Sequence, residues 1–128
     1  MVTKVTSGIK ISVDTVYESR YSDPLNNRFM FSYFITIENL SDTTVQLLRR
    51  QWDIIDSIGE KTVVEGEGVV GMQPVLKPGQ LHQYNSGCNL KTDIGKMSGS
   101  YLMERKDTGE KFKVMIPEFL LIAPYKVN

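Results

Sequence analysis

This chain of 128 residues has little of what catalytic and metal sites are usually built from, with one cysteine, Cys88, and one histidine, His82. A single cysteine cannot form a disulfide within the chain, and one Cys with one His falls short of a zinc ligand set. His82 and Cys88 are expected on one strand, where a rise of about 3.3 Å per residue separates their Cα atoms by about 20 Å. That distance is too long for a nucleophile and its base. We therefore expect a buried, inert Cys88, no metal site, no cofactor and no enzyme activity.

Net charge and long apolar runs are also absent. Fifteen basic and fifteen acidic side chains cancel, so nothing global favours nucleic acid or an anionic membrane as a partner. No apolar stretch approaches the roughly 18 residues that span a bilayer. The N-terminal stretch MVTKVTSGIKISV lacks the apolar core of a secretory signal. Together with the lone cysteine, these absences predict a cytoplasmic protein that does not enter a membrane.

The chain does have alternating apolar residues, which is the period of a half-buried strand. The clearest strand is expected over residues 29–38, where aromatic and β-branched side chains occupy alternate positions. In the next strand, over residues 44–56, we expect Leu48, Trp52 and Ile54 to face the core and Arg49 to face solvent. Further strands are expected at residues 9–13, 61–65, 81–88, 97–105 and 112–116, with Pro117 ending the last one.

About seven short strands and no helical pattern predict an all-β fold. The architecture we expect is a two-sheet immunoglobulin or fibronectin-III-like sandwich of about seven antiparallel strands, as one domain over residues 1–128. A small open barrel is the alternative. The apolar tail over residues 119–124 is expected to pack against an edge of the sandwich.

One segment, GEGVVGMQPVLKPG at residues 66–79, does not fit the strand pattern. Loops of this length in compact domains are usually functional or disordered. Its beginning matches the G-x-G-x-x-G string of dinucleotide-binding folds, through Gly66, Gly68 and Gly71. That site needs a helix directly after the glycines, and Pro74 and Pro78 exclude one. A dinucleotide-binding site is therefore not expected here, because the helix that it needs cannot follow the glycines.

Other interpretations of the glycines remain open. Backbone N–H groups of a glycine-rich loop can bind an anion without a helix, and Arg49 and Arg50 could assist from the neighbouring strand. Glu65 and Glu67 would repel a phosphate unless Mg²⁺ shielded it. The simpler alternative is that the glycines provide left-handed backbone or close chain packing.

Five stretches of the sequence resemble the ApaG family: RYSDPLNNRFMFSYFITIEN, VQLLRRQWDIID, VEGEGVVGMQPVLKPG, QYNSG and MIPEFLL. The resemblance covers about residues 9–124, and the glycine block is its most diagnostic part. It implies a fibronectin-III-like sandwich without enzyme activity. It also implies an association, by label, with cobalt and magnesium homeostasis and with dinucleoside polyphosphate hydrolysis. In larger proteins, the domain of this family resembles a protein-interaction module.

The leading functional hypothesis is a non-enzymatic binding module that contacts another protein through a sheet edge or the glycine loop. A second copy of the chain is one such partner. The alternative is binding of a nucleotide or pyrophosphate, with Mg²⁺, through Gly66, Gly68, Gly71, Arg49 and Arg50. A hydrolase using His82 and Glu67 is the third hypothesis.

Overall fold

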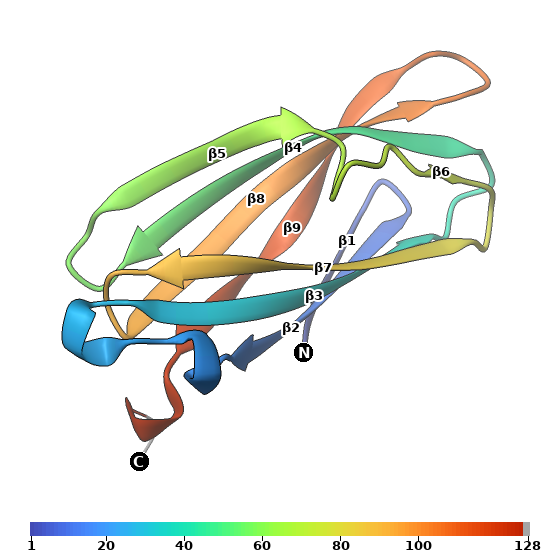
Figure 1. Cartoon of the computed structure of the whole chain (residues 1–128). Helices are drawn as coiled ribbons and strands as arrows, with labels where there is room; N and C mark the ends of the chain where they lie inside the picture. Colours follow the sequence, from blue (N-terminus) through green and yellow to red (C-terminus); the bar gives the residue numbers. More distant parts are fainter. Residues whose placement is uncertain (127–128) are drawn as a thin grey trace.

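The structure is a computed structural model that describes residues 1–126, and it contains two antiparallel sheets that face each other (Figure 1). The first sheet has the strand order β1-β2-β3-β7 and the second has β5-β4-β8-β9, with the short β6 also paired to β4. The bounds are β1 Val2–Thr6, β2 Ile9–Tyr17, β3 Phe29–Asn39, β4 Val45–Asp56, β5 Lys61–Glu67, β6 Val75–Leu76, β7 Leu81–Leu90, β8 Ile94–Arg105 and β9 Lys111–Ile122. The predicted sandwich is confirmed, with nine strands in the described residues rather than about seven.

Helical structure in residues 1–126 is limited to three 3₁₀ turns, at Ser19–Tyr21, Pro24–Asn26 and Pro124–Lys126. The first two lie in the segment between β2 and β3, where Asp23-Pro24 and Asn26-Asn27 form turns. None of the helical segments found in the described residues is long and apolar enough to cross a membrane.

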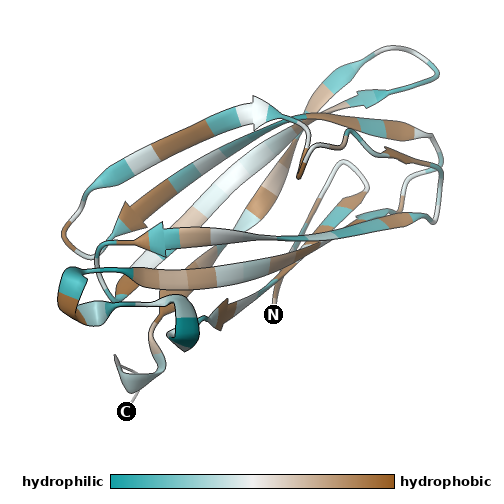
Figure 2. Ribbon diagram, viewed as in Figure 1, coloured by the Kyte–Doolittle hydropathy of each residue, from teal (hydrophilic) through white to brown (hydrophobic). Residues whose placement is uncertain are grey.

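The core lies between the sheets, and β3 contributes most clearly to it. Its residues alternate between buried and less buried positions from Phe29 to Asn39, as predicted, and brown bands recur along it in Figure 2. On the facing sheet, Met97, Tyr101 and Met103 of β8 are buried. Burying side chains of this size provides about 1.5–3 kcal/mol each, which is what holds the two sheets together.

A β-bulge in β4 changes which of its side chains face the core. The register between β4 and β8 shifts between Leu47 and Arg49, so the alternation reverses at Leu48. Val45 and Leu47 are fully buried, whereas Leu48 is only partly so. Our expectation that Leu48 faces the core was therefore wrong, because the bulge shifts the alternation of buried side chains by one residue. Beyond the bulge the expectation holds, since Trp52 is 3% exposed.

The last strand is longer than the sequence pattern predicted. Pro117 does not end it, because β9 continues to Ile122 with a register shift opposite Met97 and Gly99. β9 is an edge strand of its sheet, where a proline at a bulge costs no ladder hydrogen bond. Part of the predicted apolar tail is therefore the end of β9.

β9 also closes one side of the sandwich. It contacts β1 and β2 of the opposite sheet, and the N–H of Met115 donates to the Thr6 hydroxyl at 3.3 Å. On the other side, β5 and β7 diverge (Figure 1). The sandwich is therefore closed at β1 and β9 and open at β5 and β7.

Asn39 ties together the end of the sandwich near β6. It is fully buried, and its side-chain amide donates to the carbonyls of Thr43 at 2.8 Å and Leu76 at 3.0 Å. Its side-chain oxygen accepts from the N–H and hydroxyl of Ser41. Because a buried amide is costly without partners, this residue fixes where β6 and the β3–β4 turn meet.

Candidate functional site

The glycine segment is more ordered than its composition predicted. β5 extends through Gly66 to Glu67, and Val75 and Leu76 pair with β4 as β6. Between them, Val69 and Met72 exchange backbone hydrogen bonds of 2.8 and 3.0 Å. The expected irregular loop therefore contains the end of β5, a two-residue turn closed by Val69 and Met72, and β6.

The tip of this turn is strained. Val70 and Gly71 have φ angles of 47° and 76°, which is the pattern of a type I′ turn. A β-branched residue rarely adopts positive φ, and Val70 is 64% exposed, so little burial compensates it. Such strain persists only where neighbouring contacts hold the backbone.

Gly66 and Gly68 allow close chain packing. Gly68 has a φ of +62°, and a Cβ there would overlap the carbonyl oxygen of Met72. A Cβ on Gly66 would lie 2.9 Å from the guanidinium of Arg50. These two positions are glycine because the chain folds back on itself and on Arg50.

Arg50 holds the loop from beneath. Its Nη1 donates to the carbonyl oxygens of Glu67 and Gly68, both at 2.9 Å. The Gly68 N–H donates to the Leu48 carbonyl at 2.9 Å. The loop thus presents carbonyls to Arg50, and the N–H groups of Gly68, Val69 and Met72 have partners within the chain. This geometry leaves few donors for an anion nest of the kind expected.

Arg49 lies on the other face of the sheet, because consecutive residues of a strand face opposite sides, and the bulge at Leu48 sets Arg50 as the inward one. Its guanidinium is 4.0 Å from the Glu67 carboxylate, and both groups are exposed. With Glu65 and Lys113 it lines a shallow pocket of about 180 Å³. Of the five predicted ligand residues, the structure brings Gly66, Gly68 and Arg50 together and leaves Gly71 and Arg49 apart from them.

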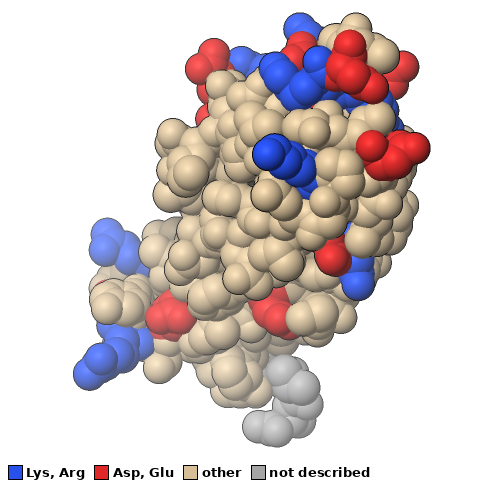
Figure 3. Space-filling model, turned by 90° about the vertical axis from the view of Figure 1, so that its right-hand side faces the viewer, with Lys and Arg blue, Asp and Glu red and all other residues tan. Residues whose placement is uncertain are grey.

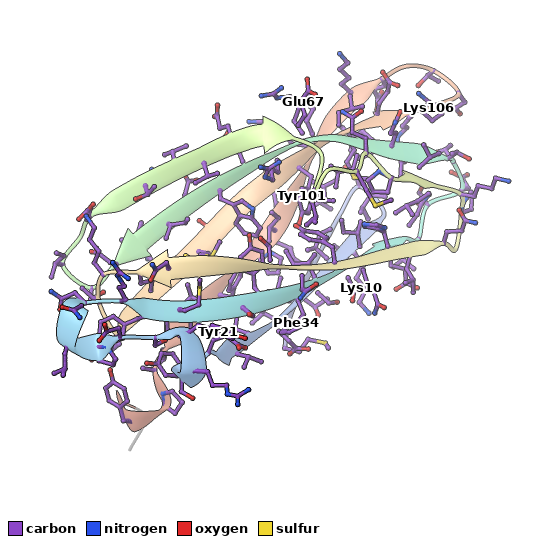
Figure 4. The ribbon with its side chains drawn as sticks, viewed as in Figure 1. Lys10, Tyr21, Phe34, Glu67, Tyr101 and Lys106 are labelled. Carbon is purple, nitrogen blue, oxygen red and sulfur yellow. The ribbon has the colours of Figure 1, made fainter. Side chains whose placement is uncertain are left out.

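A group of phenols lies below Arg50, between the sheets. The hydroxyls of Tyr84 and Tyr101 form a short hydrogen bond across the sandwich, and Figure 4 shows Tyr101 between the sheets whereas Glu67 points away from them. Burial raises the pKa of Tyr33, Tyr84 and Tyr101 above the usual value. These phenols are therefore neutral hydrogen-bonding groups at physiological pH.

The candidate catalytic residues His82 and Glu67 lie on opposite sheets. His82 stacks on Tyr84 at a ring distance of 6.2 Å, and Glu67 belongs to the opposite sheet. Cys88 is buried, as expected, and burial raises its thiol pKa to about 11. Within residues 1–126, no three His, Cys, Asp or Glu side chains are grouped to hold a metal.

Trp52 packs edge-on to Tyr33 and Phe119 in the core.

Exposed apolar side chains surround the loop and the start of β7. Met72 is 55%, Val75 51% and Leu81 52% exposed. Figure 3 shows one end of the molecule, where charged side chains gather in the upper part and the middle is mostly uncharged. Uncharged surface with exposed apolar groups is typical of a contact site for another macromolecule.

Sequence reasoning missed the open side of the sandwich. The strand β7, LHQYNSGCNL, is an edge strand of ten residues without a charged residue or proline. Proteins usually protect such edges with lysine, proline or a bulge. The lack of charge over residues 81–90 was visible in the sequence, but its position at an edge was not.

Comparison with known proteins identifies relatives over almost the whole chain. The sequence model of the ApaG domain matches residues 19–105. A protein named Protein ApaG from Vibrio cholerae serotype O1 is 49% identical over 120 residues, which is 94% of each chain. Protein ApaG from Brucella abortus is 46% identical over 124 residues, covering 97% of this chain and 95% of the relative.

Solved structures show the same fold. A Bordetella pertussis protein solved under the name ApaA superposes with a TM-score of 0.88 and 40% identity, covering 91% of this chain and 94% of that one. A protein from Archaeoglobus fulgidus superposes with a TM-score of 0.53 at 10% identity over 88% of this chain, a likeness of fold alone.

Proposed function

This chain belongs to the ApaG family, and from that premise we propose that it is a non-enzymatic binding module whose β7 edge pairs with an extended segment of another protein. The observation that carries the proposal is the unprotected edge of β7. The other edges differ, since β5 contains Glu65 and Glu67 and β1 packs beside β9. In this mode of recognition, main-chain hydrogen bonds supply affinity. The lone, buried Cys88 is compatible with a reducing cytoplasm, which we propose as the setting.

The backbone groups that β7 offers follow from its pairing with β3. The Met30 carbonyl accepts from Glu18, so even-numbered residues of β3 turn their hydrogen-bonding groups away from β7. Asn39 instead exchanges hydrogen bonds with Gly79 and Gln80. Because bonding alternates along an antiparallel strand, the odd residues of β3 bind the even residues of β7, as in the pair Ile35 and Tyr84. The odd residues of β7 therefore direct N–H and C=O outward.

This alternation provides a sharp test. Asn85→Pro removes one outward N–H and leaves the β3 ladder intact, whereas Asn85→Ala keeps that N–H. With the purified protein as bait, we expect Asn85→Ala to retain the proteins captured by the wild type and Asn85→Pro to lose them. Gln83→Pro and Gln83→Ala repeat the comparison at a second outward position. Equal capture by the proline and alanine variants of both pairs would show that β7 is not the binding edge.

The partner of β7 can also be a second copy of this chain, and the same variants test this hypothesis. Light scattering of the wild type and of Asn85→Pro measures whether β7 pairs with itself. A dimer that becomes a monomer only in the proline variant would assign the partner as another copy.

Nucleotide or pyrophosphate binding at the glycine loop has a separate measurement. Mg²⁺-ATP and a Mg²⁺ diadenosine polyphosphate are titrated while the amide resonances of Gly66, Gly68 and Gly71 are followed. Because the N–H groups of Gly68, Val69 and Met72 are engaged within the chain, we expect no saturable shift. A saturable shift at these three amides would favour the nucleotide function over the protein-binding one.

A further inference from the structure

A groove lies between the sheets on the open side of the sandwich. Its volume is about 280 Å³, and its lining comes from β3, β4, β5, β7 and β8. Ligand pockets usually measure about 300–1,000 Å³, and this groove lies just below that range, so it suits only a small ligand. It borders the edge of β7 at Gly87 and Asn89, but neither Gln83 nor Asn85 of that edge and none of the loop glycines lines it.

One positive charge faces this groove and no negative charge does. Arg50 is among the lining residues, and none of them is Asp or Glu. Only Nη1 of its guanidinium hydrogen bonds in the described residues, to the carbonyls of Glu67 and Gly68. Those two bonds fix the guanidinium and leave its other N–H groups available. A guanidinium held in this way binds a planar carboxylate through parallel hydrogen bonds.

Neutral donors lie near the guanidinium. The Tyr33 phenol and the Ser86 hydroxyl both line the groove, and Ser86 lies close enough to lower the pKa of Tyr33 and so partly offset the effect of burial. A monoanion could thus balance the single charge of Arg50 and still find further hydrogen-bond partners. A phosphate dianion would leave a second charge unpaired in a largely apolar site, which is costly.

The remaining walls are apolar. Trp52, Val64 and Met97 line the groove. Trp52 and Met97 are 3% and 1% exposed and offer a ligand little surface, whereas Val64, which pairs with Trp52, is 38% exposed. From these three features we infer that the groove binds a small monocarboxylate with an apolar body, its carboxylate at Arg50 and its body against Val64, beside Trp52.

The chain carries its own reporter for this site, because Trp52 is its one tryptophan. The probes are phenylacetate and its uncharged analogue phenylacetamide, with tryptophan fluorescence followed at increasing concentration. We expect a saturable change with phenylacetate at or below about 10 mM and at least about tenfold weaker binding of the amide. A flat phenylacetate titration, or equal binding of acid and amide, overturns the inference.

Adjacent arginines provide the matched control. Arg50→Gln is expected to lose phenylacetate binding, whereas Arg49→Gln, on the outer face, is expected to keep it. Because Arg50→Gln also removes two hydrogen bonds to the loop, Ser86→Leu provides a second variant that fills the groove with Arg50 in place. Circular dichroism confirms that each variant is folded. Binding that survives Arg50→Gln or Ser86→Leu in a folded protein places the ligand elsewhere.

The groove and the β7 edge are tested independently. Asn85→Pro alters an outward backbone group and should leave phenylacetate binding unchanged, and Ser86→Leu alters an inward side chain without touching an outward N–H. Failure of either proposal therefore does not remove the other.

Discussion

Gly68 and Gly71 share a left-handed backbone, with φ angles of +62° and +76°, but differ in their surroundings. A Cβ on Gly68 would overlap the Met72 carbonyl oxygen, whereas a Cβ on Gly71 meets nothing within 4 Å. We expect Gly71→Ala to lower the free energy of unfolding by about 1 kcal/mol, the cost of the dihedral angle alone. Gly68→Ala should cost at least about 2 kcal/mol more, because the turn must open. Urea unfolding measures both, and equal losses would contradict this account of the loop.

Val70 provides the opposite test at the same turn. Its φ of 47° is unfavourable for a β-branched residue, and its side chain is mostly exposed. Val70→Asn is therefore expected to raise the free energy of unfolding by about 0.5–1 kcal/mol, since asparagine tolerates this conformation. Val75→Asn, at an exposed valine in β6, should give no gain because extended backbone favours valine. A destabilised Val70→Asn variant would show that the valine side chain makes a contact worth more than the strain.

At the scale of elements, the pairing of β7 with β3 predicts an alternating pattern of amide exchange. The amides of His82, Tyr84, Ser86 and Cys88 donate into the ladder with β3, so they should exchange slowly in D₂O. Those of Gln83, Asn85, Gly87 and Asn89 point outward and should exchange much faster. Amide NMR spectra recorded over time after transfer to D₂O measure this directly. Uniform protection along β7 would mean that its outer edge is already covered, for example by a second copy.

How far the sequence predicts these elements depends on whether burial alternates along them. β3 was predictable because alternate apolar side chains enter the core throughout its length. β1 was not predicted, because four of its five residues are exposed and leave no alternating pattern. β9 was cut short at Pro117, because a proline normally ends a strand and only its edge position permits it here.

The candidate site was less predictable than the strands, for a local reason. The glycines marked the correct loop, but the bulge at Leu48 decides that Arg50 and not Arg49 reaches it. A bulge adds one residue to a strand without a distinctive sequence. The inter-sheet groove is lined by residues of strands that are distant in the chain, such as Tyr33, Arg50 and Ser86, and no local sequence pattern predicts that they come together.

At the scale of the whole molecule, the two sides of the sandwich differ in the polar groups that they bury. The side closed by β9 and β1 is packed with apolar residues such as Ile11, Val114 and Ile116. Near the open side, the phenols of Tyr33, Tyr84 and Tyr101 and the thiol of Cys88 are buried enough to raise their pKa values. The buried phenols and thiol whose pKa values are raised by burial are therefore concentrated on the open side of the sandwich.

This concentration predicts alkaline destabilisation of the whole fold. The thiol pKa of Cys88 is raised from 9.0 in its ordinary state to about 11 in the folded protein, so the fold favours the protonated form. The resulting stability is fully present below pH 9 and is lost as the pH rises through 11. Each such group lowers the free energy of unfolding by about 1.4 kcal/mol per pH unit between its two pKa values. The buried phenols extend the loss to higher pH.

Urea unfolding at intervals between pH 7 and pH 11 separates the thiol from the phenols. Cys88→Ala lowers the free energy of unfolding at pH 7, because it removes a buried sulfur. From pH 9 upward its curve should fall less steeply than that of the wild type, since the mutant has no thiol to ionise. The two curves therefore converge as the pH rises, and the residual slope of Cys88→Ala reports the phenols. Parallel curves across this range would show that the Cys88 thiol ionises as readily in the folded protein as in the unfolded chain.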